Sequence, residues 1–138
     1  MSVRSGSWSQ LGDLLSPLRA EVFIREQQVP EELEWDEDDA TALHFVAEDE
    51  AGQVTGCARL LPSGQIGRMA VARAFRRRGW GSLLLVGAES AARDKGMAEV
   101  FLHAQVHAIP FYSRHGYIIE SEIFMDAGIP HRTMRKTL

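Results

Sequence analysis

The 138-residue sequence has a single cysteine and no long apolar run. Cys57 therefore cannot form a disulfide within the chain, and its alternating apolar neighbours predict a buried thiol. No stretch approaches the roughly 20 apolar residues that a helix needs to cross a bilayer, and residues 1–7 lack the apolar core of a secretion signal. These absences favour a cytoplasmic protein with no membrane partner.

An excess of positive charge is also missing, because the formal net charge is −4. Neutralisation of phosphates drives most nucleic-acid binding, so this balance disfavours a nucleic-acid partner. The chain does have an ordinary globular composition, with 45% hydrophobic and 25% charged residues. Its length suits one hydrophobic core, and we expect residues 1–138 to form one domain.

The first third of the chain predicts two short helices and a loop. Apolar spacing places the helices at about residues 10–15 and 17–28, with the pair Ser16-Pro17 as N-cap and first position of the second helix. That helix must end before Pro30, which disfavours helix in the residue before it. Residues 31–39 form an acidic run that is too charged to pack as an element, which indicates a loop.

The rest of the chain alternates between strand and helix patterns. One helix is predicted at 81–95, with Gly96 after it as the C-terminal cap. A turn at 49–52 joins the first two strands into a hairpin. The remaining predictions are strands at 42–47, 54–61, 66–71, 100–102, 117–124 and 131–136, and a short helix at 108–114.

Arginines and glycines converge directly before the helix predicted at 81–95. The first N–H groups of a helix have no internal partners, and the helix dipole places about half a positive charge there, which suits a diphosphate. Glycine lets the backbone approach a ligand, and arginine adds forked donors for phosphate oxygens. The segment predicts an anion site formed by Arg76, Arg77, Arg78, Gly79, Trp80, Gly81 and Ser82.

The segment does not match the other common phosphate-binding loops, and the chain does not match common metal sites. A P-loop requires a lysine after Gly81, and a dinucleotide loop requires a third glycine where Leu84 stands, so both patterns fail. A solvated turn and a nucleic-acid patch remain open, although the acidic remainder argues against the patch. No metal site is predicted, because Asp36-x-Asp38 lacks the glycine and terminal glutamate of a calcium loop and the histidines lack zinc spacing.

Arg76-x-x-Gly79-x-Gly81 resembles the acetyl-CoA signature of the Gcn5-related N-acetyltransferase (GNAT) superfamily, Gln/Arg-x-x-Gly-x-Gly/Ala. A second stretch of that superfamily is similar to Gln105-x-x-Ala108-x-x-Phe111-Tyr112-x-x-x-Gly116-Tyr117. Three further stretches resemble the ElaA-like branch: Arg19-Ala20-Glu21-Val22-Phe23-Ile24-x-Glu26-Gln27; Glu34-x-Asp36 with Asp39 and His44; and Gly128-Ile129-Pro130-His131-x-x-Met134. Together these matches extend over nearly the whole chain.

The resemblance implies an α/β (α+β) GNAT fold. Its central sheet would be mixed, mostly antiparallel, of about six to seven strands splayed between strands 4 and 5, with about four flanking helices. It implies an N-acetyltransferase that uses acetyl-CoA as co-substrate and a small molecule or peptide as amine acceptor, in a monomer or homodimer. The cofactor arm would lie along Met69, Ala70 and Val71, and Gln105 would replace the family's usual asparagine.

The chemistry also calls for an acid and a base. A lysine-like amine with a pKa of about 10.4 is protonated at neutral pH and must lose a proton before it attacks. Tyr112 stands at the family's position for the general acid that protonates the leaving thiolate, although it could instead be a packed aromatic. A non-catalytic acetyl-CoA sensor of the same fold could dispense with it. The candidate bases are Glu26, Glu34, His44 and His131.

Overall fold

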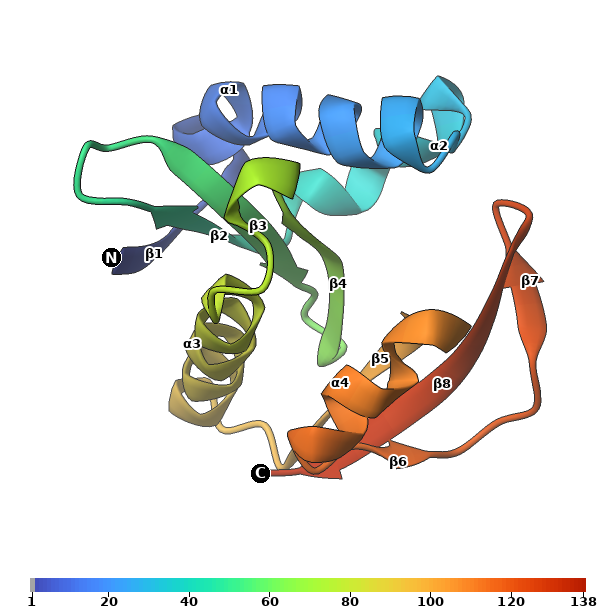
Figure 1. Cartoon of the computed structure of the whole chain (residues 1–138). Helices are drawn as coiled ribbons and strands as arrows, with labels where there is room; N and C mark the ends of the chain where they lie inside the picture. The colour runs from blue at the N-terminus through green and yellow to red at the C-terminus, as the bar shows by residue number, and fades with distance from the viewer. Residues whose placement is uncertain (1) are drawn as a thin grey trace.

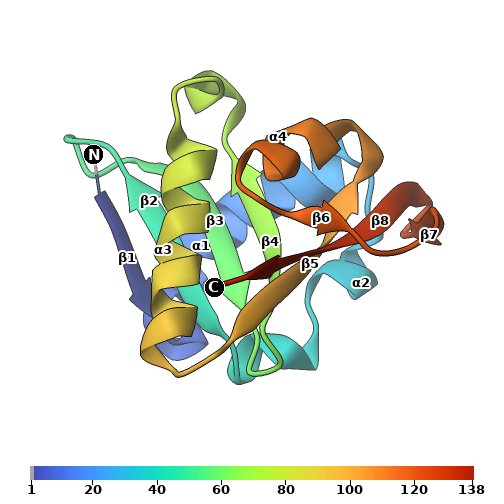
Figure 2. The ribbon, with the colours of Figure 1, turned by 90° about the horizontal axis from the view of Figure 1, so that it is seen from below.

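The computed structural model describes residues 2–138, in which an eight-stranded sheet carries helices on both faces (Figures 1 and 2). The sheet order is β1-β2-β3-β4-β5-β8-β6, with β7 paired to β8. Every neighbouring pair is antiparallel except β4 and β5, which confirms the predicted fold class. The strands are β1 (Ser2–Gly6), β2 (Leu43–Glu48), β3 (Val54–Leu60), β4 (Gln65–Val71), β5 (Glu99–Gln105), β6 (Ile118–Ile119), β7 (Phe124–Asp126) and β8 (Ile129–Thr137).

The parallel strands β4 and β5 separate soon after they meet. Their ladder has only the pairs Gln65–Phe101 and Ile66–Leu102. Beyond these pairs the two halves of the sheet diverge, as Figure 1 shows for β4 and β5. The edge of β4 that would pair with β5 is therefore open from residue 67 onward, and the splay predicted between strands 4 and 5 is present.

A bulge in β4 lies at the start of this opening. Cys57 pairs with Ala70 and Arg59 with Gly67, so Arg68 and Met69 face the single residue Ala58. Arg68 has a φ of 47°, which is uncommon for a residue other than glycine. The extra residue bends the strand and redirects the side chains near the split.

Hydrophobic cores lie on both faces of the sheet. α3 (Trp80–Asp94) packs on one face through fully buried leucines and alanines, including Leu84, Leu85 and Ala88. α1 (Trp8–Arg19) covers the other face, and Figure 2 shows the two helices on opposite sides. Cys57 belongs to the α1 core, as predicted, and burial raises the pKa of its thiol to about 12.

The prediction of two helices divided at Ser16-Pro17 is wrong. α1 continues through Pro17 and runs directly into the π-helix η1 (Ala20–Glu26). Pro17 and Asp13, whose carbonyl loses its usual donor, are both exposed, so water can replace the missing bond. The actual N-cap is Ser7, whose Oγ accepts from the Gln10 amide at 3.3 Å while the Gln10 side chain accepts from the Ser7 amide at 2.9 Å.

Three other segments differ from the sequence-based expectation. β1 was not predicted, because only the last residue of this polar strand is buried. The acidic run is not a simple loop, since it contains α2 (Glu31–Glu34) and the 3-10 turn η2 (Glu37–Ala40) with buried carboxylates. The strand expected at 117–124 divides into β6 and β7.

The remaining predicted elements are confirmed to within a few residues. They are the β2–β3 hairpin, β4, α3 with Gly96 after it, β5, β8 and the short helix α4 (Ile109–Arg114). The 3-10 turns η3 (Arg73–Phe75) and η4 (Val106–Ala108) precede α3 and α4. No helix within residues 2–138 is long and apolar enough to cross a membrane.

Candidate functional site

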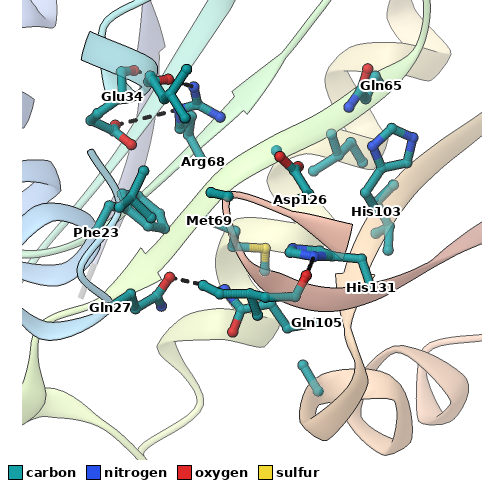
Figure 3. A pocket seen from close by; sticks show the side chains of 18 of the residues that line it. Phe23, Gln27, Glu34, Gln65, Arg68, Met69, His103, Gln105, Asp126 and His131 are labelled. Atoms are coloured by element: carbon teal, nitrogen blue, oxygen red, sulfur yellow. Dashed lines mark hydrogen bonds and ion pairs between the residues drawn. The ribbon is translucent and has the colours of Figure 1, made fainter. Parts of the chain in front are cut away.

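A pocket of about 270 Å³ lies over the split between β4 and β5. Met69 of β4 and Gln27, which follows η1, line it from one half of the sheet. Gln105 of β5, Tyr112 of α4 and His131 of β8 line it from the other half. Figure 3 shows Met69, Gln27, Gln105 and His131 converging on this space, and the Gln105 Nε2 group donates a hydrogen bond to Gln27 Oε1 at 2.9 Å.

The open edge of β4 presents backbone groups toward the split. The Ala72 amide donates to Thr55 O of β3 at 2.8 Å, so the adjacent Val71 directs its N–H and C=O to the opposite side. The Arg76 Nε group donates to Val71 O at 2.9 Å on that side. The Val71 N–H therefore points into the split beside Met69, while Ala70 is buried and pairs with Cys57.

The N-terminus of α3 is an open cradle of backbone donors. Its N-cap is Gly79, which has a φ of 87° and forms no side-chain capping bond. A Cβ at Gly79 would meet no atom within 4 Å, and Arg77 also adopts a positive φ of 65°. Because the first-turn N–H groups of α3 lack side-chain acceptors and carry the positive end of the helix dipole, they fit a diphosphate.

The three arginines of this loop have different surroundings. Arg77 and Arg78 are exposed, and neither forms an ion pair within the described residues 2–138. The Arg76 guanidinium instead donates hydrogen bonds to both carboxylate oxygens of Glu26 in η1, at 2.6 and 2.8 Å. The hydrogen bonds from Arg76 lower the pKa of Glu26, so this carboxylate is a weak base that ties η1 to the loop.

Trp80, Gly81 and Ser82 form the first turn of α3. The Trp80 side chain is buried in the core, so only its backbone faces the cradle. A Cβ on Gly81 would lie 3.4 Å from Phe111. The Ser82 hydroxyl lies 2.9 Å from His115 Nε2, a contact that connects α3 to the end of α4.

Tyr112 reaches across the split from α4. Its hydroxyl lies 3.9 Å from Met69 Sδ, and its ring contacts Tyr117 with a centroid separation of 5.9 Å. Burial raises the pKa of Tyr112 to about 12, so the phenol is protonated at neutral pH. The structure therefore brings a protonated hydroxyl to the open edge of β4.

An arginine–carboxylate network with a buried centre forms one wall of the pocket, which Glu34 and Arg68 line. Its centre is Arg19 of α1, which is 1% exposed and lies between Trp8 and Trp35 at 5.1 Å from each ring. Arg19 donates to Glu34 Oε2 at 2.6 Å and to Asp39 Oδ1 at 2.9 Å. The acidic run is thus held inside the protein by an arginine from another element.

Two arginines of the sheet complete this network. Arg59 of β3 lies 2.7 Å from Asp36 and 3.1 Å from Asp39. The bulge residue Arg68 lies 3.0 Å from Asp36 and 3.3 Å from Glu34, so the six members balance three positive and three negative charges. The full set is Arg19, Glu34, Asp36, Asp39, Arg59 and Arg68.

The network affects the pKa values of its carboxylates in opposite directions. Burial raises the pKa of Glu34 against the opposing charges of Arg68 and Arg19. Burial also acts on Asp39, but there the hydrogen bonds and charges of Arg19 and Arg59 outweigh it and lower the pKa. Glu34 reaches the pocket lining, yet its side chain is held by two arginines.

His44 lies apart from the other base candidates. It is buried against Trp8 at a centroid separation of 4.9 Å, and its Nε2 lies 2.9 Å from Asp39 O. Burial lowers its pKa. His44 does not line the pocket, whereas His131 does.

Several pocket residues were not predicted from the sequence. Gln27 lies within the ElaA-like stretch, but no local pattern gives it a role. Arg68, His103 and Asp126 also line the pocket. Arg68 lies in the bulge of β4, and Asp126 lies at the turn after β7, where Ala127 has a φ of 51°; neither feature leaves a clear signal in the sequence.

Comparison with known proteins places this geometry in a family. The family model described as an acetyltransferase (GNAT) domain matches residues 12–138. The uncharacterized N-acetyltransferase YjcF of Bacillus subtilis (strain 168) is 41% identical over 122 residues, which cover 86% of this chain and 87% of YjcF. Escherichia coli ElaA has a TM-score of 0.87 at 28% identity, and an acyl-CoA N-acyltransferase from Pseudomonas aeruginosa has 0.86 at 32%. Both structural alignments cover 99% of each chain.

Replacing Arg19 with methionine should strongly destabilise the protein. The change keeps an apolar stem but leaves Glu34 and Asp39 buried without their central partner, which should cost about 3–5 kcal/mol in free energy of unfolding at pH 7. Arg25→Met is the matched control, because its side chain is 68% exposed in an i,i+4 pair with Glu21. The control should cost less than about 1 kcal/mol in urea denaturation.

The loss of folding free energy in Arg19→Met should also depend on pH. Without Arg19 the stranded carboxylates have folded pKa values above their unfolded values of about 4, so protonation stabilises the variant as pH falls. In the wild type, Asp39 has a lowered pKa and contributes stability that is present above its unfolded pKa and lost as pH falls through its folded pKa. The difference in free energy of unfolding between the wild type and Arg19→Met should therefore become smaller below about pH 5. A difference that stays constant or grows on acidification would contradict the role of Arg19 as partner of the two buried carboxylates.

Proposed function

The chain belongs to the GNAT acetyltransferase family, and from this premise we propose that it transfers an acetyl group from acetyl-CoA to a primary amine of a small molecule or peptide. The observation that carries this proposal is the meeting of a protonated phenol, Tyr112, with the open backbone edge of β4 in one pocket. Acyl transfer from a thioester requires a donor for the carbonyl oxygen and a proton for the leaving sulfur. Tyr112 offers the proton, and the open edge of β4, which continues from Met69 in the pocket lining to Val71, offers the donor.

Acetyl-CoA, the acyl donor, would extend from the N-terminus of α3 to the split between β4 and β5. Backbone amides of residues 77–82 and the free guanidinium groups of Arg77 and Arg78 suit the diphosphate of coenzyme A. The open edge of β4 suits an extended arm with amide groups, since such an arm can bond to a strand edge. The similarity to an acyl-CoA N-acyltransferase at 32% identity supports a coenzyme A thioester as donor.

The N–H of Val71 is the proposed donor to the carbonyl oxygen of the thioester. Fixed donors aimed at an oxygen that gains negative charge are commonly the largest single contribution to catalysis. Tyr112 protonates the sulfur, and its raised pKa keeps it protonated across the neutral range. Gln105 and Gln27 are joined by a hydrogen bond in the pocket lining, and we propose that they contact the cofactor arm or the acceptor.

Attack by the amine is direct, in a ternary complex, rather than through an acyl-enzyme. Cys57 is the only cysteine of the chain, and it is 1% exposed within the core. Burial raises the pKa of this thiol to about 12, so almost no thiolate exists at neutral pH. Cys57 also does not line the pocket.

The proposal predicts amine-dependent release of coenzyme A. Purified protein should be mixed with acetyl-CoA and a panel of polyamines, amino sugars, amino acids and peptides, and free thiol should be followed. At least one acceptor should raise release above the spontaneous rate, and the acetylated product should gain one acetyl group by mass. Tight acetyl-CoA binding with no acceptor-dependent release would instead identify a sensor of the same fold.

Tyr112→Phe should lower kcat by about 100-fold or more with little change in acetyl-CoA affinity, because it removes only the acidic hydroxyl. Tyr117→Phe is the matched control. Its hydroxyl donates to Glu89 at 2.7 Å in the core, so its loss should reduce stability but leave kcat near that of the wild type. Equal kcat values for Tyr112→Phe and the wild type would refute the acid assignment.

Gly79→Val should abolish most acetyl-CoA binding, because a branched side chain at this positive φ disturbs the cradle and occupies the ligand's approach. Gly52→Val provides a control with the same backbone strain. Gly52 has a φ of 80° and, like Gly79, no atom within 4 Å of an added Cβ, but it lies in the β2–β3 turn. Calorimetric titration should show loss of affinity in the first variant only.

A further inference from the structure

The proposed transfer requires a group that takes a proton from the acceptor, and the structure reduces the candidates to one. Both oxygens of Glu26 are bound by Arg76. Glu34 is 2% exposed and lies within 3.3 Å of two arginines. His44 does not line the pocket and contacts Asp39 O. Each of these three groups is already committed to a structural contact.

His131 lines the pocket and differs because one of its ring nitrogens has a defined acceptor, while Nε2 forms no hydrogen bond within the described residues 2–138. Its Nδ1 lies 2.7 Å from Ile129 O. A carbonyl oxygen can only accept, so Nδ1 must carry the proton, and in the neutral ring Nε2 keeps its lone pair. This bond selects the tautomer that a base acting through Nε2 requires.

The packing around His131 holds the ring in place. The residue is 7% exposed, and its ring stacks on Phe124 of β7 at 6.0 Å with an interplanar angle of 21°. In the β5–β8 ladder it stands opposite Gln105, the last residue of β5 and a member of the pocket lining. Figure 3 shows the His131 ring beside Met69 and near Gln105. The imidazole is thus rigid and borders the space where the acyl group would lie.

We propose that His131 is the general base of the transferase, and that it accepts a proton from the acceptor ammonium at Nε2. This assignment rests on the proposed function. The ammonium gives one proton to Nε2, and the freed lone pair forms a C–N bond to the thioester carbonyl carbon. The C–S bond breaks with its electron pair on sulfur, which takes the proton of the Tyr112 hydroxyl.

Two further proton transfers complete the cycle. The nitrogen loses its second proton, which returns through water to the Tyr112 oxygen. The proton on His131 passes to solvent, so one proton is released for each amide formed. Tyr112 and His131 both end the cycle in their starting protonation states.

Other titratable groups line the pocket together with His131. On the neighbouring strands these are His103 of β5 and Asp126 of β7, and burial lowers the pKa of His103. His107 of η4 and Tyr112 of α4 lie on the same half of the sheet, and the pair Glu34 and Arg68 lies across the pocket. Asp126, the last residue of β7, adds a negative charge to the pocket lining.

His131→Asn is the sharpest test, because the Asn amide can still donate to Ile129 O while nothing replaces Nε2. With an acceptor amine of high pKa, kcat should fall by about 100-fold, and the decrease of kcat at acidic pH seen in the wild type should disappear. With an acceptor amine that is already neutral at the assay pH, most of the rate should return. His44→Asn serves as the control and should keep the decrease at acidic pH and the kcat per folded molecule.

A second measurement does not depend on turnover. Nitrogen-15 NMR of the histidine rings should show the Nδ1–H tautomer for His131 in the neutral protein. An Nε2–H tautomer, or equal loss of kcat with acceptors of high and low pKa, would overturn the assignment. If the wild type shows no acceptor-dependent thiol release, the proposed function fails; if it turns over and His131→Asn matches it, only the base assignment fails.

Discussion

The buried arginine–carboxylate network is the constraint on which the rest of the site depends. Arg19 anchors it from α1, and Arg59 and Arg68 anchor it from the sheet. Moving one of its charges into water would strand a partner in the interior, at a cost of several kcal/mol. The segment after α1 therefore cannot shift without breaking the network, and this fixes one wall of the pocket. Because Arg68 is itself the bulge residue, the same network holds the distorted part of β4.

The other wall has a different origin. β5 and β8 share a full antiparallel ladder, whereas β4 and β5 share two register pairs. Few backbone bonds therefore connect the two halves of the sheet at the split. Side-chain contacts cross it instead, namely Gln27 with Gln105 and Met69 with Tyr112. The space between the two halves is therefore bordered by side-chain amides and a thioether.

The sequence predicted what depends on local rules and missed what depends on distant partners. The arginine–glycine loop, α3 and the hairpin were found because their signals lie within a few residues, and the resemblance to the GNAT family is confirmed. The sequence alone predicts a loop for the acidic run, because the arginines that neutralise its carboxylates lie 15 to 34 residues away along the chain. The sequence predicts a helix start at Pro17, because the exposure that lets this proline lie inside α1 depends on the fold. β1 has no apolar alternation, and only pairing with β2 makes it a strand.

The division of the proposed chemistry follows from this architecture. Tyr112 and His131 both belong to the half built on β5 and β8, and the Val71 N–H belongs to the half built on β4. The proposed acid and base therefore lie on the same half of the sheet, with His131 in the β5–β8 ladder and Tyr112 in α4, while the proposed donor for the carbonyl oxygen lies on the half that contains the arginine–carboxylate network. An acyl group can meet all three only when its thioester spans the split. Binding of the cofactor arm along β4 would thus set the distance between the halves and align the catalytic groups in the same step.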